Sequence, residues 1–65
     1  MTLEEKLILR IVKEELKWAL DGCEYHYNKT KHLDNQYADP DLNHYIGRKE
    51  ACESILKELE RIGIK

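Results

Sequence analysis

The chain has 65 residues, 42% hydrophobic and 37% charged, with one proline, three glycines and no phenylalanine. A chain this short forms one domain at most and usually needs a disulfide, a metal or a partner chain for stability. Its 11 basic residues against 13 acidic ones give a net charge of -2, so binding to duplex nucleic acid is not expected.

The first predicted element is a long helix from Thr2 to about residue 35. Thr2 and Glu5 form a capping box, in which each side chain can bond to the backbone amide of the other residue. Asp21-Gly22 is the one interior break signal, and it costs a helix only about 1 kcal/mol. Apolar residues recur at three- and four-residue steps, as on one helical face: Leu3, Leu7, Ile8, Ile11, Val12, Leu16, Ala19, Leu20, Cys23 and Tyr27.

A second helix is predicted over residues 40–62. Asp39 suits the N-cap position, Pro40 suits the first turn, and Gly63 suits the position after the helix. The apolar face of this helix carries Leu42, Tyr45, Ile46, Cys52, Ile55, Leu56, Leu59 and Ile62. The sequence therefore predicts an all-α fold, an antiparallel helical hairpin that forms a single domain over residues 1–65.

The two predicted helices differ in length by about eleven residues. If the chain folds back near residue 38, the second helix covers the first only to about Leu16, and an apolar stripe remains in water. We expect copies of the chain to associate through this arm, because no loop-like segment follows Gly22 that would allow a compact three-helix bundle instead. The expected oligomer interface consists of Leu3, Leu7, Ile8, Ile11, Val12 and Leu16.

Aromatic and basic residues cluster around the predicted hairpin tip. The candidate contact surface consists of Tyr25, Tyr27, Lys29, His32, Tyr37, His44, Tyr45 and Arg48. Tyrosine and arginine are favoured at binding surfaces, although tyrosines can also simply fill space with their hydroxyl groups in water. We expect a non-enzymatic homo-oligomeric module that binds a partner protein at this tip. An alternative function is sequestration of an anionic nucleotide at the same place.

The two cysteines allow three interpretations. Cys23, His26 and Cys52 could contribute to a zinc site, which normally needs three or four ligands. The cysteines could also form a disulfide, or remain free thiols that act as small apolar groups. No signal-peptide pattern opens the chain and no apolar run is long enough for a membrane span. We therefore expect a cytoplasmic protein with free thiols, no membrane contact, no metal and no cofactor.

Two further patterns have ordinary explanations that we favour. Asp21 and Glu24 on the first helix, and Glu50 and Glu53 on the second, could hold Mg²⁺ for nucleotide hydrolysis, but such pairs are common on solvated helix faces. Gly47, with Ala51 and Ser54, could admit a neighbouring helix, and we expect it to serve packing within the hairpin.

Residues 45–56, YIGRKEACESIL, carry a Tyr-x-Gly-x-x-x-Ala pattern before an Ile-Leu pair. This segment resembles the last helix of many small proteins encoded by bacteriophages and other mobile elements. The resemblance implies a helical protein that acts by binding, either to a host protein or to a small signalling molecule. It supplies no catalytic residues.

Overall fold

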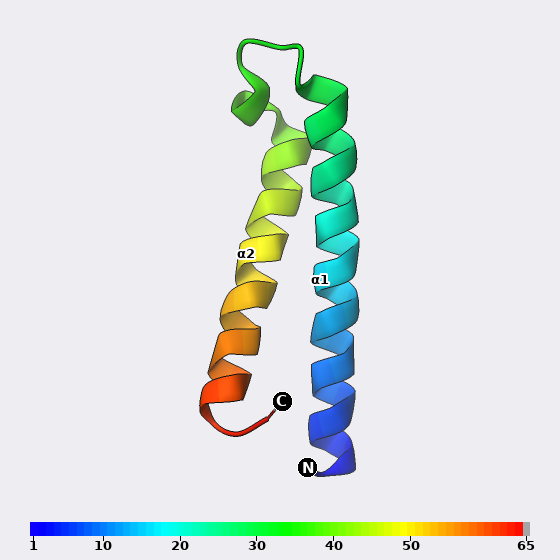
Figure 1. Ribbon diagram of the computed structural model, residues 1–65, viewed down its shortest axis with the longest axis vertical. Helices are drawn as coiled ribbons and strands as arrows, with labels where there is room; N and C mark the ends of the chain where they lie inside the picture. The colour runs from blue at the N-terminus through cyan, green and yellow to red at the C-terminus, as the bar shows by residue number, and fades with distance from the viewer. Residues whose placement is uncertain (65) are drawn as a thin grey trace.

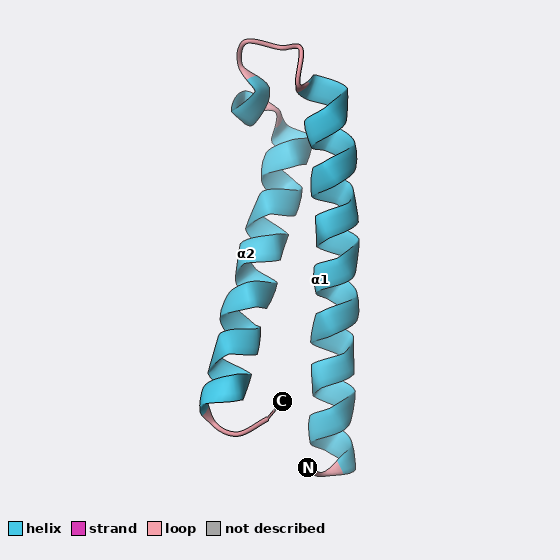
Figure 2. Ribbon diagram, viewed as in Figure 1, coloured by secondary structure: helices cyan, strands magenta, loops and turns pink. Residues whose placement is uncertain are grey.

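The protein is described by a computed structural model that covers residues 1–64. Helix α1 (Leu3–Thr30) is followed by a loop with the short 3-10 helix η1 (Gln36–Ala38), and then by helix α2 (Pro40–Arg61). The two long helices run antiparallel, with the loop at one end and both chain ends at the other (Figure 1). Figure 2 shows that residues 1–64 contain helices and loops but no strand. The predicted helical hairpin is confirmed.

The helix starts have the predicted caps. The Glu5 amide donates to the Thr2 hydroxyl at 3.1 Å, and the Thr2 amide donates to the Glu5 carboxylate at 3.4 Å. At the start of α2, the Asp39 carboxylate accepts from the Leu42 amide at 2.9 Å, and Pro40 occupies the first turn. These contacts satisfy amides that have no partner within the helix.

Helix α1 ends at Thr30, five residues before its predicted end at about residue 35. Contacts from the loop satisfy the carbonyls of its last turn, which would otherwise lack partners. The Gln36 side chain donates to the Tyr27 carbonyl at 2.7 Å, and the Leu33 amide donates to the Thr30 carbonyl at 2.9 Å. The chain therefore turns over residues 31–39, earlier than predicted.

One line of side chains from each helix forms the seam of the hairpin. Its members recur at alternating steps of three and four residues, the repeat that keeps packed helices in contact. Helix α1 supplies Leu9, Val12, Leu16, Ala19, Cys23, His26 and Thr30, and α2 supplies Leu42, Tyr45, Lys49, Cys52, Leu56 and Leu59, all buried or half-buried. Ala19, Leu42 and Cys52 are its buried hydrophobic residues.

The predicted extent of the uncovered arm is wrong, because α2 covers more of α1 than the sequence predicted. Because the chain turns early, α2 pairs with α1 well beyond Leu16: Arg48 bonds to Glu15, and Leu56 lies beside Leu9. Val12 and Leu16 thus belong to the seam of the hairpin and are not free for an oligomer interface. The other four residues of the expected interface remain exposed: Leu3, Leu7, Ile8 and Ile11.

Helix α1 runs unbroken through Gly22, so the three-helix alternative does not occur. The glycine is needed for packing, because a Cβ atom there would lie 2.3 Å from Cδ1 of the Tyr45 ring. A Cβ atom at Gly47 would meet no atom within 4 Å. The expected packing role within the hairpin therefore belongs to Gly22, and its assignment to Gly47 is wrong.

We predict opposite effects for alanine at these two helical glycines. Gly22→Ala should lower the free energy of unfolding by about 1–3 kcal/mol, because the Tyr45 ring must move. Gly47→Ala should raise it by about 0.5–1 kcal/mol, because alanine favours helix and the site has room. Urea unfolding followed by circular dichroism measures both effects. Equal stabilisation by the two substitutions would contradict the close contact at Gly22.

Candidate functional site

The structure does not gather the predicted tip residues into one surface. Tyr25 and Tyr27 are two positions apart on α1, so their side chains leave different sides of the helix. Both are exposed, as is Tyr37 on η1, which is the most exposed of the four tyrosines at 64%. Lys29 and His32 are also exposed. The loop end thus offers separate aromatic and basic side chains.

Tyr45 and His44 belong to an aromatic cluster between the helices. The half-buried Tyr45 ring lies 4.7 Å from Trp18 and is stacked on His26 at 5.2 Å, centroid to centroid. His44 meets the edge of Trp18 at 6.3 Å. The sequence did not predict the contacts of Trp18 with Tyr45 and His44, because Trp18 lies off the main apolar stripe of the first helix.

Arg48 also forms an ion pair with a residue of the same hairpin. Its Nε donates to Oε1 of Glu15 at 3.0 Å, and its Nη2 bonds to the same oxygen. The hydrogen bond and the charge of Glu15 raise the pKa of the Arg48 guanidinium. Arg48 is therefore paired along the hairpin with Glu15, and it does not lie with the residues of the loop.

Exposed apolar side chains gather on one face of the hairpin. On this face a shallow groove of about 250 Å³ runs between the helices, with Ile11 and Glu15 on one side and Arg48, Ala51 and Ile55 on the other. Helical spacing places further exposed residues on the same side. We call this set the apolar face: Ile8, Ile11, Trp18, Ala51, Ile55 and Ile62.

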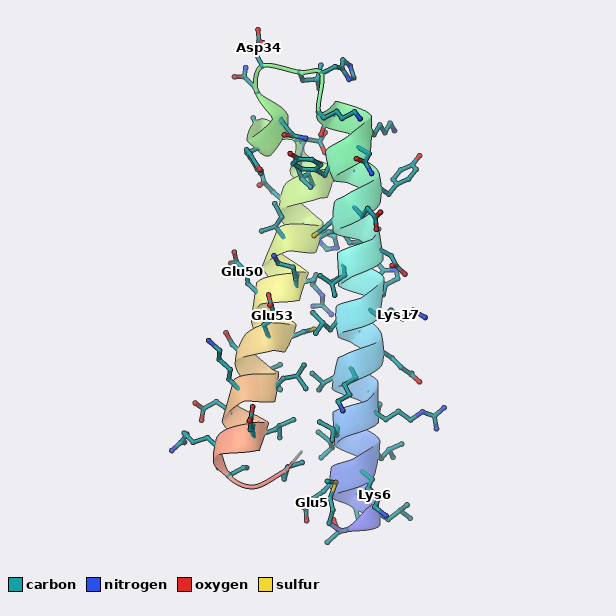
Figure 3. All side chains as sticks on the ribbon, in the orientation of Figure 1. Glu5, Lys6, Lys17, Asp34, Glu50 and Glu53 are labelled. Carbon is teal, nitrogen blue, oxygen red and sulfur yellow. The ribbon has the colours of Figure 1, made fainter. Side chains whose placement is uncertain are left out.

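The opposite side of the hairpin carries charged side chains beside apolar ones. The groove there is lined by Lys13 and Glu60 together with Leu9, Leu56 and Ile64. Figure 3 shows Glu50 and Glu53 along α2, and Lys6 and Lys17 along α1. Both grooves of the hairpin therefore combine charged and apolar side chains, and the exposed isoleucines lie on the apolar face.

The cysteines and carboxylates do not form the sites considered from the sequence. Cys23 is half-buried and Cys52 is buried, and both are free thiols. Within residues 1–64, one group of three or more potential metal ligands has its ligand atoms within 4.8 Å of one another: His26, Asp39 and Asp41. The carboxylates considered for Mg²⁺ binding, Asp21 and Glu24 on α1 and Glu50 and Glu53 on α2, do not belong to this group.

Comparisons with known proteins place no function on the chain. No protein-family model matches it, and neither a curated protein nor a solved structure shows significant similarity. The resemblance to small phage-encoded proteins rests on residues 45–56 alone. Among the described residues, neither long helix has an apolar stretch sufficient to cross a bilayer.

We predict that the four tyrosines differ sharply in their contribution to stability. Tyr45→Ala should cost about 2 kcal/mol, because the ring fills the space against Gly22, Trp18 and His26. Tyr37→Ala should change stability by less than about 0.5 kcal/mol, because that ring is exposed. Chemical unfolding gives both values. The emission of Trp18, the single tryptophan, should shift for the Tyr45 variant alone, and an equal shift for both would contradict the cluster.

Proposed function

We propose that the protein is a non-enzymatic module that self-associates through its apolar face and presents its loop end to a partner protein. The simplest assembly is two hairpins packed face to face as a four-helix bundle. The observation that carries this proposal is the row of exposed apolar side chains on one face of a molecule only one helix thick.

The dimensions of the hairpin support a second layer. It measures 47 × 17 × 13 Å, with a radius of gyration of 14.4 Å, whereas a compact chain of 65 residues has about 11 Å. Its two long helices lie side by side in a single layer (Figure 1). Stable domains usually enclose a core between two packed layers, and one hairpin provides a single layer.

The accessible surface area of the hairpin also supports a second layer. The hairpin exposes 5123 Å², whereas a compact monomer of its mass, 7.8 kDa, exposes about 4,400 Å². The excess of roughly 700 Å² is close to the 800 Å² or so that each partner buries in a standard protein interface. A second copy is an appropriate occupant, because its own apolar face has the same need for cover.

The proposed interface differs from the arm expected from the sequence. Ile8 and Ile11 are retained, and Val12 and Leu16 are used within the hairpin. Leu3 and Leu7 remain exposed near the N-terminus. Trp18, Ala51 and Ile55 join from both helices. The interface thus extends along the hairpin instead of being confined to one end.

The loop end stays accessible in such an assembly, because it lies beyond the last turns of both helices. Figure 3 places Asp34 at its extremity. His32, Leu33 and Tyr37 are exposed there, and tyrosine gives a large contact area with a hydroxyl group at low entropic cost. These side chains support the loop end as the surface for a partner protein.

We predict a solution mass that is a multiple of 7.8 kDa, measured by light scattering behind a sizing column. Ile55→Glu should lower this mass towards that of one chain, because a buried carboxylate without a partner is strongly unfavourable. The adjacent substitution Ser54→Glu is the matched control and should leave the mass unchanged, because Ser54 lies outside the apolar face. A wild-type mass of one chain with full helicity would contradict self-association.

For the partner-binding part, we predict that the double variant His32→Ala, Tyr37→Ala loses its partner while keeping its mass and helicity. The wild type and Ser54→Glu should capture the same protein from an extract of the source cells, since neither alters the loop end. Mass spectrometry of the captured material gives the comparison. If the double variant captures that protein as well as the wild type does, binding takes place elsewhere.

A further inference from the structure

His26, Asp39 and Asp41 bring three potential metal ligands together at the loop end of the hairpin. One ligand atom from each lies within 4.8 Å of the others. His26 comes from the last two turns of α1, Asp39 is the N-cap of α2, and Asp41 lies in the first turn of that helix. The turn over residues 31–39 is what carries the two aspartates back to the histidine.

The surroundings hold two of the three side chains in place. The half-buried His26 ring is stacked on Tyr45 and meets the edge of Tyr25 at 5.0 Å. The Asp39 carboxylate uses Oδ2 to accept from the Leu42 amide, which leaves Oδ1 free. The imidazole and the Asp39 carboxylate therefore lose little further freedom when they bind an ion, and only the exposed Asp41 must be ordered.

We propose that this trio binds a divalent transition-metal ion of the Zn²⁺ class. One imidazole nitrogen and two carboxylate oxygens suit such ions, whereas Ca²⁺ and Mg²⁺ prefer all-oxygen sites. Zinc holds these ligands at about 2.0–2.2 Å, so the ligand atoms must approach one another to about 3.3 Å. The Asp41 side chain is exposed and therefore able to rotate towards the other two ligands. A water molecule or a partner's side chain would complete the tetrahedron.

The ion would join the end of α1 to the start of α2. It would close the loop between the helices and thereby stabilise the hairpin where the seam ends, since metal binding to the folded state adds to folding stability. This site differs from the Cys23, His26 and Cys52 set considered from the sequence. It shares His26 with that set and uses aspartates in place of the thiols.

Titration of the full chain with ZnCl₂ in a calorimeter at neutral pH tests the site. We expect one Zn²⁺ per chain and a higher melting temperature with the metal. His26→Gln and Asp41→Asn should each weaken binding tenfold or more, because loss of an outer partner of a ligand already costs about 10–100-fold. Asp39→Asn should weaken it as well while keeping the helix cap, since asparagine caps helices as well as aspartate does.

Two controls separate this site from other zinc binding by the chain. His32→Gln removes an exposed histidine outside the trio and should leave the affinity unchanged. Cys23→Ser should also leave it unchanged, whereas a large loss there would assign the metal to the thiols and overturn the proposal. The absence of any Zn²⁺-dependent heat or thermal shift, or undiminished binding by Asp41→Asn, would overturn it equally. Asp41 is exposed, so that variant should retain the helicity of the wild type without metal.

Discussion

The contact of Tyr45 with the bare backbone at Gly22 fixes how the two helices lie against each other. Any side chain at position 22 would occupy the space of the ring, so the absence of a side chain lets α2 approach α1 closely at this height. Once this pair is in place, the repeat of three and four residues brings the other seam positions opposite each other, including Cys52 against Val12 and Leu56 beside Leu9. The same register carries the Asp39 cap to His26. The aromatic cluster, the ion pair and the candidate metal ligands all lie in the register that this contact favours.

The seam between the two helices is only partly apolar, because polar residues occupy several of its positions. His26, Lys49 and Thr30 take the places of apolar residues, and the Thr30 hydroxyl is satisfied by donating to the His26 carbonyl at 2.7 Å. Buried hydrophobic residues are few and small apart from Leu42. Hydrophobic stabilisation grows with the apolar area removed from water, so this single line of contact supplies little of it. The apolar face holds the side chains whose burial would supply the remainder.

The sequence predicted the fold well where the signals are local. The capping box at Thr2, the Asp39-Pro40 start of α2 and the left-handed Gly63 after it, with a φ of 94°, depend on neighbouring residues only. The end of α1 depends instead on Gln36, nine residues beyond the carbonyl that it caps, and no periodicity reports such a contact. That five-residue error shifted the register and produced the long uncovered arm. It also misplaced two of the candidate residues: Tyr45 and Arg48 were expected at the tip, whereas Tyr45 packs against Trp18 and Arg48 pairs with Glu15 further along the hairpin.

The Glu15–Arg48 pair lies within the apolar face, beside the groove that Ile11 and Ile55 flank. In a single hairpin it contributes little, because both side chains remain partly in water and exposed ion pairs are worth at most about 1 kcal/mol. In the proposed assembly the pair is covered, and a covered pair is tolerated far better than either charge alone. If one copy were shifted along the other, the Glu15–Arg48 pair would face isoleucines of the second copy. A two-fold axis near the pair would instead place the pairs of the two copies next to each other. A polar position in an otherwise apolar helical interface selects register and copy number in this way, at some cost in stability. In the proposed assembly, the pair would therefore matter less for the stability of one hairpin than for the alignment of the two copies.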